Sequence, residues 1–338
     1  MNSAIIKGMG YYVPSNVVTN DDLATLMDTN NEWIVERTGI NERRWIKDNS
    51  ESTSSMALEA SKNAIADAEI DKTEIDFIIF ATLSPDYYFP GPGVTLQKDL
   101  GLDTIGALDV RNQCSGFVYA LSIADQYIKT GMYKNILVVG SEYHSGGLDK
   151  STKGRGVTVI FGDGAGAAIV SKSPNADRGI LSTHLHSQGE FAEELTLIGP
   201  STRRWVPEII DGAGKDDEAI YPYMNGTFVF KHAVTRFPQV IGEALTQNNL
   251  KSTDINLLIP HQANLRISQF VQQKMGLRDD QVFNNIQKYG NTTAGTLPLC
   301  LWDWEKQLKK GDNLILAAFG GGFTWGSIYL KWAYDSKK

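Results

Sequence analysis

The sequence predicts an α/β protein made of two similar halves, and two features of its 338 residues support this prediction. The first is an internal repeat: TEIDFII at 73–79 resembles TDINLLI at 253–259, and NILVV at 135–139 resembles NLILA at 313–317. The second is an alternation of helix-like and strand-like segments, which is typical of layered α/β folds. The repeat is far longer than the roughly 20–50 residues of a solenoid unit. We therefore expect two half-domains that face each other, with a small-molecule site at their seam.

Each expected element of the first half rests on its pattern of apolar residues. Alanines at positions 57, 60, 64 and 68 have helical spacing, and continuous apolar runs indicate strands buried on both faces. The expected elements are helix 54–68, strand 75–81, strand 105–110, helix 116–130 and strand 135–139. The segment FGDGAGA at 161–167 lacks the G-x-G-x-x-G spacing of a nucleotide loop. We expect it to be a tight turn between strands 157–161 and 167–170.

The second half follows the same order. The expected elements are helix 228–248, strand 255–259, helix 296–308 and strand 313–318. The polar stretch 189–221 contains Gly199-Pro200 and DGAG at 211–214, and is expected to be a long loop or insertion. The two halves are assigned to residues 1–178 and 179–338.

Composition and charge narrow the class of protein. The chain is 42% hydrophobic and 21% charged, so a sizeable core can be buried, and its length suggests about two domains. A formal charge of −7 argues against non-specific nucleic-acid binding, although it leaves room for a local basic patch. Residues 1–20 lack the pattern of a signal peptide, and no apolar run is long enough to span a membrane. Two cysteines make no disulfide framework, so we expect a reduced, cytoplasmic protein.

Three polar residues lie at corresponding places in the two halves. Cys114 lies between an expected strand and an expected helix, where the helix dipole favours a thiolate. His261 follows the strand 255–259, and Asn291 precedes the helix that the repeat pairs with the one after Cys114. Ligands of α/β sheets gather at the carboxyl ends of strands. We therefore expect Cys114 and Asn291 to face each other, with His261 between them.

Each of these residues also has a structural interpretation. A lone cysteine is usually a small buried hydrophobe, and an asparagine before a helix is usually a cap. The three together favour catalysis, whereas Cys300, in an apolar segment, is expected to be a core thiol. His184 and His186 alternate on an expected strand, but no nearby cysteine or carboxylate clearly completes a metal site, so no metal is expected.

A glycine-rich segment, FGGGF at 319–323, follows the last strand of the repeat. Glycines allow a backbone to approach a ligand closely and to present its N–H groups. Such groups could form an oxyanion hole.

Six segments resemble the ketoacyl synthase III enzymes, thiolase-fold condensing enzymes that begin fatty acid synthesis. They are DTNNEWIVERTGI at 28–40, DVRNQCSG at 109–116, FGDGAGA at 161–167, PHQANLR at 260–266, YGNT at 289–292 and FGGGFTWG at 319–326. The resemblance implies a thiolase-like α/β fold, with two pseudo-symmetric βαβαβαββ halves in five α-β-α-β-α layers. It also implies that Cys114, His261 and Asn291 form a Cys-His-Asn triad.

The resemblance further implies a reaction. Cys114 attacks an acyl-CoA thioester, and the acyl-enzyme then meets malonyl-acyl carrier protein, which loses CO₂ and forms a new carbon–carbon bond. His261 and Asn291 would hold the enolate oxygen, while the N–H groups of Cys114 and Gly321 would form the oxyanion hole. No cofactor is expected, because CoA and the phosphopantetheine of the carrier protein enter as substrates.

The same resemblance assigns binding roles, and for each charged residue a solvated surface cation is the alternative. The implied CoA-binding residues are Trp33, Arg37 and Arg155; the implied acyl-pocket residues are Phe89 and Phe319; and the implied carrier-protein contacts are Lys231 and Arg266. Phe89 would enter the pocket of a partner subunit, which implies a homodimer.

Two departures from the family leave the primer open. The stretch 189–221 is longer than the corresponding family loop, and YYFPGPG at 87–93 is more aromatic and glycine-rich. Medium or branched acyl groups are therefore options. A degradative thiolase would carry a second cysteine near the glycine loop, and 319–326 has none. A ketosynthase or acyltransferase of specialised metabolism, with another acceptor, remains an alternative. A non-catalytic dimer partner would be expected to lose Cys114.

Overall fold

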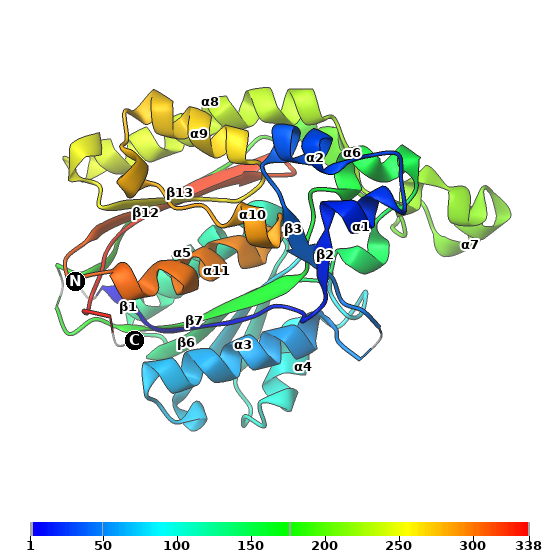
Figure 1. Cartoon of the computed structure of the whole chain (residues 1–338). Helices are drawn as coiled ribbons and strands as arrows, with labels where there is room; N and C mark the ends of the chain where they lie inside the picture. Colours follow the sequence, from blue (N-terminus) through cyan, green and yellow to red (C-terminus); the bar gives the residue numbers. More distant parts are fainter. Residues whose placement is uncertain (1–2, 49, 176, 337–338) are drawn as a thin grey trace.

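Two β-sheets enclose a layer of helices, and further helices cover both outer faces (Figure 1). The computed structural model describes residues 3–48, 50–175 and 177–336. The central helices are α5 (Gly116–Thr130) and α11 (Thr296–Trp304). The outer helices are α3 (Thr53–Ala68) and α4 (Pro92–Asp99) on one side, and α8 (Gly226–Gln247) and α9 (Leu265–Met275) on the other. These layers confirm the α-β-α-β-α architecture that the resemblance implies.

The first sheet belongs to the first half of the chain and has the strand order β1-β7-β6-β4-β5. Its strands are β1 (Ala4–Tyr12), β4 (Phe77–Ala81), β5 (Gly106–Val110), β6 (Asn135–Glu142) and β7 (Gly164–Lys172). β4 is parallel to both β5 and β6, and β7 is antiparallel to β6 and β1. Since parallel strands end at the same sheet edge, the turns after β4, β5 and β6 lie together.

The second sheet has the order β11-β12-β13-β8 and repeats the first with one strand fewer. Its strands are β8 (Gly179–Ser187), β11 (Leu257–Pro260), β12 (Asn313–Gly320) and β13 (Thr324–Lys331). Beside β11, where the first sheet has β5, there is an isolated parallel bridge between Leu258 and Val282. The assigned boundary at residues 178 and 179 falls where the connection after β7 ends and β8 begins.

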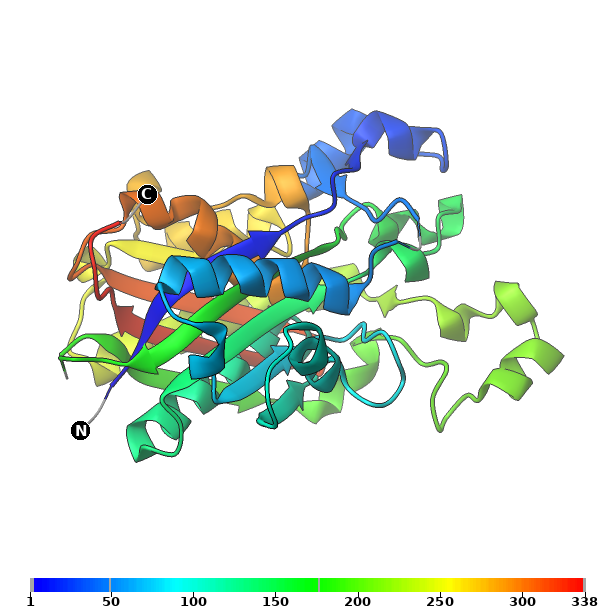
Figure 2. The same cartoon turned by 90° about the horizontal axis from the view of Figure 1, so that it is seen from below.

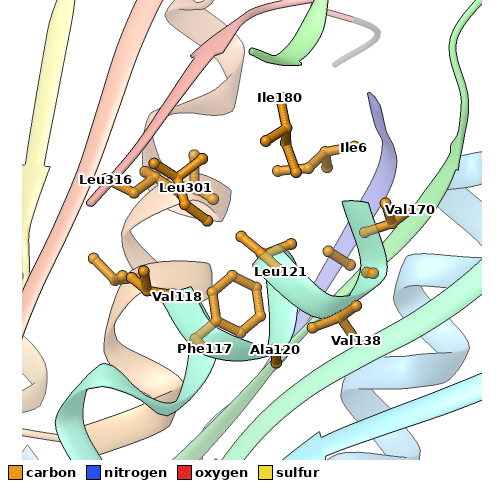
Figure 3. Close-up of a cluster of buried hydrophobic side chains, with 14 of the residues drawn as sticks. Ile6, Phe117, Val118, Ala120, Leu121, Val138, Val170, Ile180, Leu301 and Leu316 are labelled. Atoms are coloured by element: carbon orange, nitrogen blue, oxygen red, sulfur yellow. The ribbon is translucent and has the colours of Figure 1, made fainter. Parts of the chain in front are cut away.

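Helix α5 joins the two sheets through its apolar side chains. Phe117, Val118 and Leu121 are fully buried, and Figure 3 shows them among side chains that come from both sheets and from α11. Burying a side chain of this size contributes roughly 1.5–3 kcal/mol. The helix ends at Gly131, whose φ of 77° lies in the left-handed region that favours glycine. This packing fixes the N-terminus of α5, where Cys114 lies.

The smaller elements surround one end of the sheets. They are β2 (Val17–Thr19), α1 (Asn20–Ala24), α2 (Asn31–Thr38), β3 (Glu42–Arg44), α6 (Arg155–Thr158), β9 (Leu195–Thr196), α7 (Val206–Asp211), β10 (Tyr223–Met224) and α10 (Ile286–Tyr289). Among the helices that the structure describes, none combines the length and apolar character that a membrane span needs.

The expected strand pair around residues 161–167 is wrong. Residues 155–158 form helix α6, and β7 runs without a break from Gly164 through 167–170. The glycines of this segment serve helix packing, because a Cβ at Gly166 would lie 2.6 Å from Pro298 of α11. A glycine pattern alone cannot distinguish a turn from a strand that a helix approaches closely.

The stretch expected to be a loop at 189–221 is a small folded unit. Together with β10 it forms what we call the arm, residues 189–224, which contains α7, short 3₁₀ turns and the two-stranded pair β9–β10. Figures 1 and 2 both show it projecting away from the five layers. Leu195 belongs to the arm, but its side chain lines the cavity in the body of the protein that is described below.

Candidate active site

Cys114 occupies a 3₁₀ turn, residues 113–115, that connects β5 to the N-terminus of α5. The turn opens with Gln113, which has a φ of 45° and so places the following residue at a sharp corner. The Cys114 side chain is 7% exposed and borders a cavity. The position predicted from the sequence, between a strand and a helix, is therefore confirmed.

The thiol of Cys114 is electrostatically different from the expectation. Burial and, secondarily, the charge of Glu142 raise its pKa to about 12, whereas hydrogen bonds from its own backbone N–H, Thr293 and Asn291 act to lower it. The surroundings of the thiol thus favour its protonated form, against the expected shift toward the thiolate. Sequence shows that a cysteine begins a helix, but the burial that opposes ionisation depends on distant segments.

Asn291 is held on both sides by the backbone of the first half. Its N–H donates to the carbonyl oxygen of Ile160 at 2.9 Å, and its own carbonyl oxygen accepts from the N–H of Gly162 at 3.0 Å. Its Oδ1 accepts from the Thr293 N–H at 2.8 Å, which leaves the amide NH₂ to donate toward the Cys114 thiol. The expected meeting of Cys114 and Asn291 across the seam is confirmed.

His261 follows β11, and its N–H donates to the carbonyl oxygen of Ala317 in β12 at 2.7 Å. The side chain is 2% exposed, and among the described residues neither ring nitrogen has a hydrogen-bond partner. Burial lowers the pKa of His261 to about 3, so the imidazole is neutral at physiological pH. A buried imidazole with two unpartnered nitrogens can both donate to and accept from a substrate.

The glycine-rich segment meets Cys114 through its first glycine. A Cβ on Gly320 would lie 2.5 Å from Cys114 Cβ and 2.9 Å from its Sγ, so only glycine fits there. A Cβ on Gly321 would instead face Leu195 of the arm, with the carbonyl oxygen at 3.1 Å. The oxyanion role of Gly321 stays a prediction. Sequence reasoning missed Gly320, and its place directly at the end of the last repeated strand was the available signal.

A cavity of about 450 Å³ connects Cys114 to the protein surface. Its lining includes Trp33, Arg37, Cys114, Leu195, Phe230, Arg266, Asn291, Phe319 and Gly320. Cys114 and Gly320 therefore share one cavity with the aromatic and cationic residues of α2 and α9. A volume of this size suits a small-molecule substrate.

The three expected CoA-binding residues lie together. The guanidinium carbons of Arg37 and Arg155 lie 4.6 Å and 5.0 Å from the ring centroid of Trp33. Arg37 is on α2 and Arg155 on α6, so the tertiary structure brings the cluster together from two segments. An aromatic face with two cations is suited to a planar base that carries phosphates.

The expected acyl-pocket residues lie in different places. Phe319 lines the cavity, and its ring centroid lies 4.9 Å from that of Phe323. Phe89, in the connection between β4 and α4, is 81% exposed and does not line the cavity of its own chain. Leu195 of the arm lines the cavity as well, and nothing in the sequence indicated this residue.

The two expected carrier-protein contacts are both exposed. Arg266 lines the cavity and lies 6.0 Å from the ring centroid of Phe230, whereas Lys231 lies on α8 beside that phenylalanine. Both therefore lie close to the same opening.

The remaining candidates have structural contacts. His184 and His186 of β8 lie 3.8 Å and 2.7 Å from a carboxylate oxygen of Glu243, a partner that the sequence did not reveal. Among the described residues, no group of three or more potential ligands is arranged to hold a metal ion. Cys300 is fully buried, and its thiol donates to Oδ1 of Asn285 at 3.0 Å, which confirms the core thiol.

Comparisons with known proteins agree with this site. Residues 108–189 match the family model of 3-oxoacyl-[acyl-carrier-protein] synthase III, and residues 245–332 match the model of its C-terminal part. The chain is 39% identical to beta-ketoacyl-[acyl-carrier-protein] synthase III of Porphyromonas gingivalis, over 98% of this chain and 97% of that one. It is 44% identical to the Aliivibrio fischeri enzyme of that name, over 96% and 98% of the two chains.

Solved structures show the same likeness. The crystal structure of 3-oxoacyl-[acyl-carrier-protein] synthase III from Aquifex aeolicus superposes with a TM-score of 0.88 at 39% identity, over 98% of this chain and 100% of that one. The priming beta-ketosynthase of the R1128 polyketide pathway superposes with a TM-score of 0.89 at 29% identity, over 99% and 97% of the two chains. The chain belongs to the 3-oxoacyl-[acyl-carrier-protein] synthase III family.

Proposed function

We propose that this chain joins an acyl-CoA primer to malonyl-acyl carrier protein, with loss of CO₂, and so produces the 3-oxoacyl-carrier protein that begins fatty acid synthesis. The observation that carries the proposal is the cavity itself. It places the buried Cys114 thiol beside Asn291 at its inner end and Trp33 with Arg37 toward its opening. The names of the relatives support the same activity.

The first step is acyl transfer to Cys114. The sulfur of Cys114 bonds to the thioester carbon, the bond from that carbon to the CoA sulfur breaks, and the thiol proton passes to the departing CoA. Negative charge develops on the acyl oxygen, where the N–H groups of Cys114 and Gly321 act as the oxyanion hole. The neutral His261, with unpartnered ring nitrogens, can accept the thiol proton and return it to the leaving sulfur.

The second step forms the carbon–carbon bond. Malonyl-carrier protein loses CO₂, and the electron pair of the broken bond forms an enolate whose oxygen accepts from His261 and Asn291. The enolate carbon then attacks the carbonyl carbon of the acyl-cysteine, the bond from that carbon to the Cys114 sulfur breaks, and the departing thiolate takes up a proton from water to restore the thiol. His261 needs no net change of charge to donate this hydrogen bond, because burial already keeps it neutral.

The surface around the opening accounts for both substrates. We assign the CoA adenine and phosphates to Trp33, Arg37 and Arg155, and the acidic carrier protein to Lys231 and Arg266. A local basic patch on a protein of charge −7 can steer an acidic partner to the opening. We also propose a cytoplasmic homodimer, in which the exposed Phe89 enters the acyl pocket of the partner subunit.

Intact-protein mass spectrometry tests this function. The protein is mixed with acyl-CoAs of short to medium chain length, and malonyl-carrier protein is then added. We expect an acyl adduct that Cys114→Ala loses, that Cys300→Ala keeps, and that malonyl-carrier protein discharges into a 3-oxoacyl product. An adduct discharged only by another acceptor would instead establish the specialised-metabolism alternative, the class to which the similar polyketide priming enzyme belongs. No adduct with any thioester would refute the mechanism.

A further inference from the structure

A histidine that the proposed reaction does not use contacts a residue that lies beside the Cys114 thiol. His144 follows β6 (Asn135–Glu142) and is 9% exposed. Its Nε2 lies 2.8 Å from Oγ1 of Thr293, and the Thr293 side chain in turn acts on the Cys114 thiol as a hydrogen-bonding group that lowers its pKa. The imidazole, the hydroxyl and the thiol therefore form a chain of three polar groups that ends at the nucleophile.

The imidazole of His144 is held firmly from its backbone. The His144 N–H donates to Oδ1 of Asp163 at 2.7 Å, and this buried carboxylate also accepts from the N–H groups of Ser145 and Ile46. The ring of Phe161 packs against the imidazole, with the centroids 4.7 Å apart. Few orientations of the ring are therefore open, and its Nε2 stays directed at Thr293.

The backbone and side chain of Thr293 are also held in place by their surroundings. It has a φ of 49° in the turn before α11, and its N–H donates to Oδ1 of Asn291. Its side chain is buried, so its hydroxyl has two partners available, Nε2 of His144 and Sγ of Cys114. A hydroxyl has one hydrogen, so the partner that donates to its oxygen decides where that hydrogen points.

We propose that His144 is a positioning residue for the nucleophile: its Nε2–H donates to Oγ1 of Thr293, so that the Thr293 hydroxyl donates to Cys114 and stabilises the thiolate. The inference deepens the proposed function and rests on it, since it concerns how Cys114 becomes reactive. His144 itself is not among the residues that line the cavity, although its ring packs against Phe161, which is.

The electrostatic environment of Cys114 explains why a hydrogen bond from the Thr293 hydroxyl matters. Burial and the charge of Glu142 disfavour the thiolate, and hydrogen bonds donated to a sulfur anion act in the opposite direction. Burial lowers the pKa of His144 to about 3, so the ring is neutral and carries a single N–H. The titratable groups that act on this chain of contacts are Glu142, whose charge raises the pKa of the thiol, His144, which contacts Thr293, and Asp163, which accepts from the backbone N–H of His144.

The pH dependence of Cys114 alkylation by iodoacetamide, followed by intact mass, tests the proposal without any substrate. Thr293→Val keeps the shape and removes the hydroxyl, and His144→Leu removes the donor. We expect either change to raise the alkylation pKa by about one unit, which is tenfold less thiolate at a given pH. The matched controls Thr293→Ser and His144→Gln, which keep a hydroxyl and a side-chain N–H, should stay within about threefold of the wild-type rate, a margin well inside that tenfold change.

Steady-state kinetics supply a second measurement. For Thr293→Val we expect kcat to fall about tenfold, with the KM for acyl-CoA unchanged, because the ground-state contacts of CoA lie elsewhere. Folded variants with the wild-type alkylation profile would overturn the proposal. If the wild type forms no acyl-enzyme while the alkylation shift is present, the proposed function fails and the positioning role stands.

The tautomer of His144 can be read in the wild-type protein, should a variant not fold. Nitrogen-15 labelling of histidine, with His144→Gln used to assign the signal, reports which ring nitrogen carries the proton. We expect the proton on Nε2. A proton on Nδ1 would make Nε2 an acceptor, would turn the Thr293 hydroxyl away from the thiol, and would overturn the proposal.

Discussion

The two central helices begin with almost the same turn, yet only one of the two turns contains the proposed nucleophile. Residues 113–115 precede α5 and residues 293–295 precede α11, and each turn opens with a left-handed residue, Gln113 at φ 45° and Thr293 at φ 49°. The residue at the corner is Cys114 in the first turn and Ala294 in the second. The fold therefore forms two equivalent turns, one before each central helix, and the proposed nucleophile Cys114 lies in one of them.

The other two proposed catalytic residues lie in the second half of the chain and have no polar and buried counterpart in the first. Counting by the repeat of 180 residues, His261 corresponds to Ala81 and Asn291 to Arg111. Ala81 is fully buried, whereas Arg111 is exposed. One half therefore supplies the nucleophile and the other its polar partners. Burying a full polar set in each half would cost folding free energy, because polar groups without partners are unfavourable in a core.

The strand ends, by contrast, are alike in the two halves. A Cβ on Gly140, beside the second corner, would lie 2.2 Å from the carbonyl oxygen of Ala294, and a Cβ on Gly320 would lie 2.5 Å from Cβ of Cys114. Both corners are thus packed by a strand from the other side of the seam. The comparison teaches that the symmetric backbone sets the geometry, while single side chains assign the roles.

Replacing Cys114 at the first corner by alanine, the residue at the second corner, should have the largest effect on activity. Cys114→Ala makes the two corners alike, and we expect it to abolish acyl-enzyme formation because, of the described residues that line the cavity, Cys114 alone carries a thiol. Intact-protein mass after incubation with acyl-CoA measures this. Cys300→Ala is the control, since that thiol is fully buried away from the site. An adduct on the Cys114→Ala protein would mean that the nucleophile is another residue.

Replacing the polar partner and its counterpart should give unequal results. Asn291→Ala removes a hydrogen-bond donor, and we expect decarboxylative condensation to slow by roughly 10²–10³. Arg111→Ala changes an exposed side chain, and we expect stability within about 0.5 kcal/mol of wild type with normal turnover. Release of labelled CO₂ from malonyl-carrier protein measures both. Equal losses would contradict the division of roles between the halves.

Adding one methyl group at each strand end should distinguish an effect on stability from an effect on the reactivity of Cys114. Gly140→Ala and Gly320→Ala both overfill a packed corner, and we expect each to lower the free energy of unfolding by about 1–3 kcal/mol. Only Gly320→Ala presses on Cys114, so only it should also slow alkylation and acylation. Urea unfolding and iodoacetamide labelling on both variants compare the two. Normal acylation by folded Gly320→Ala would show that this contact does not position the thiol.

The smallest effect concerns the pH dependence of stability. His261 is neutral in the folded protein because burial lowers its pKa from 6.5 to about 3, whereas its counterpart Ala81 cannot titrate. The unfolded chain binds the proton first, so the stability contributed by neutral His261 is present above pH 6.5 and is lost as the pH falls toward 3. The loss approaches 1.4 kcal/mol per pH unit.

A comparison of wild type with His261→Asn separates the contribution of His261 to stability from the contributions of other titrating groups. Glu142, whose pKa burial raises to about 7, acts in the opposite sense, because its contribution is present below pH 4.5 and is lost as the pH rises to about 7. The unfolding free energy of wild type and His261→Asn, measured by urea at pH 7, 6 and 5, should converge as the pH falls. Parallel curves would show that His261 is not held neutral by burial.

Much of this architecture followed from local pattern. Helix α5 occupies the expected residues 116–130, and β6 and β12 begin at the expected Asn135 and Asn313, because apolar periodicity is a property of neighbouring residues. The expected strand at 157–161 is wrong for the converse reason. Its short apolar run suits a strand, but the chain forms α6 and an isolated bridge from Phe161 to Asn291, 130 positions along the sequence.

The sequence by itself determined that the chain is a doubled α/β protein with a cysteine, a histidine and an asparagine at related strand ends. Only the tertiary structure decided how those groups behave. The raised pKa of Cys114, the contact with Gly320, the entry of Leu195 into the cavity and the chain from His144 through Thr293 all join residues from distant segments. Burial and electrostatic environment depend on what packs around a group, and no local pattern records that.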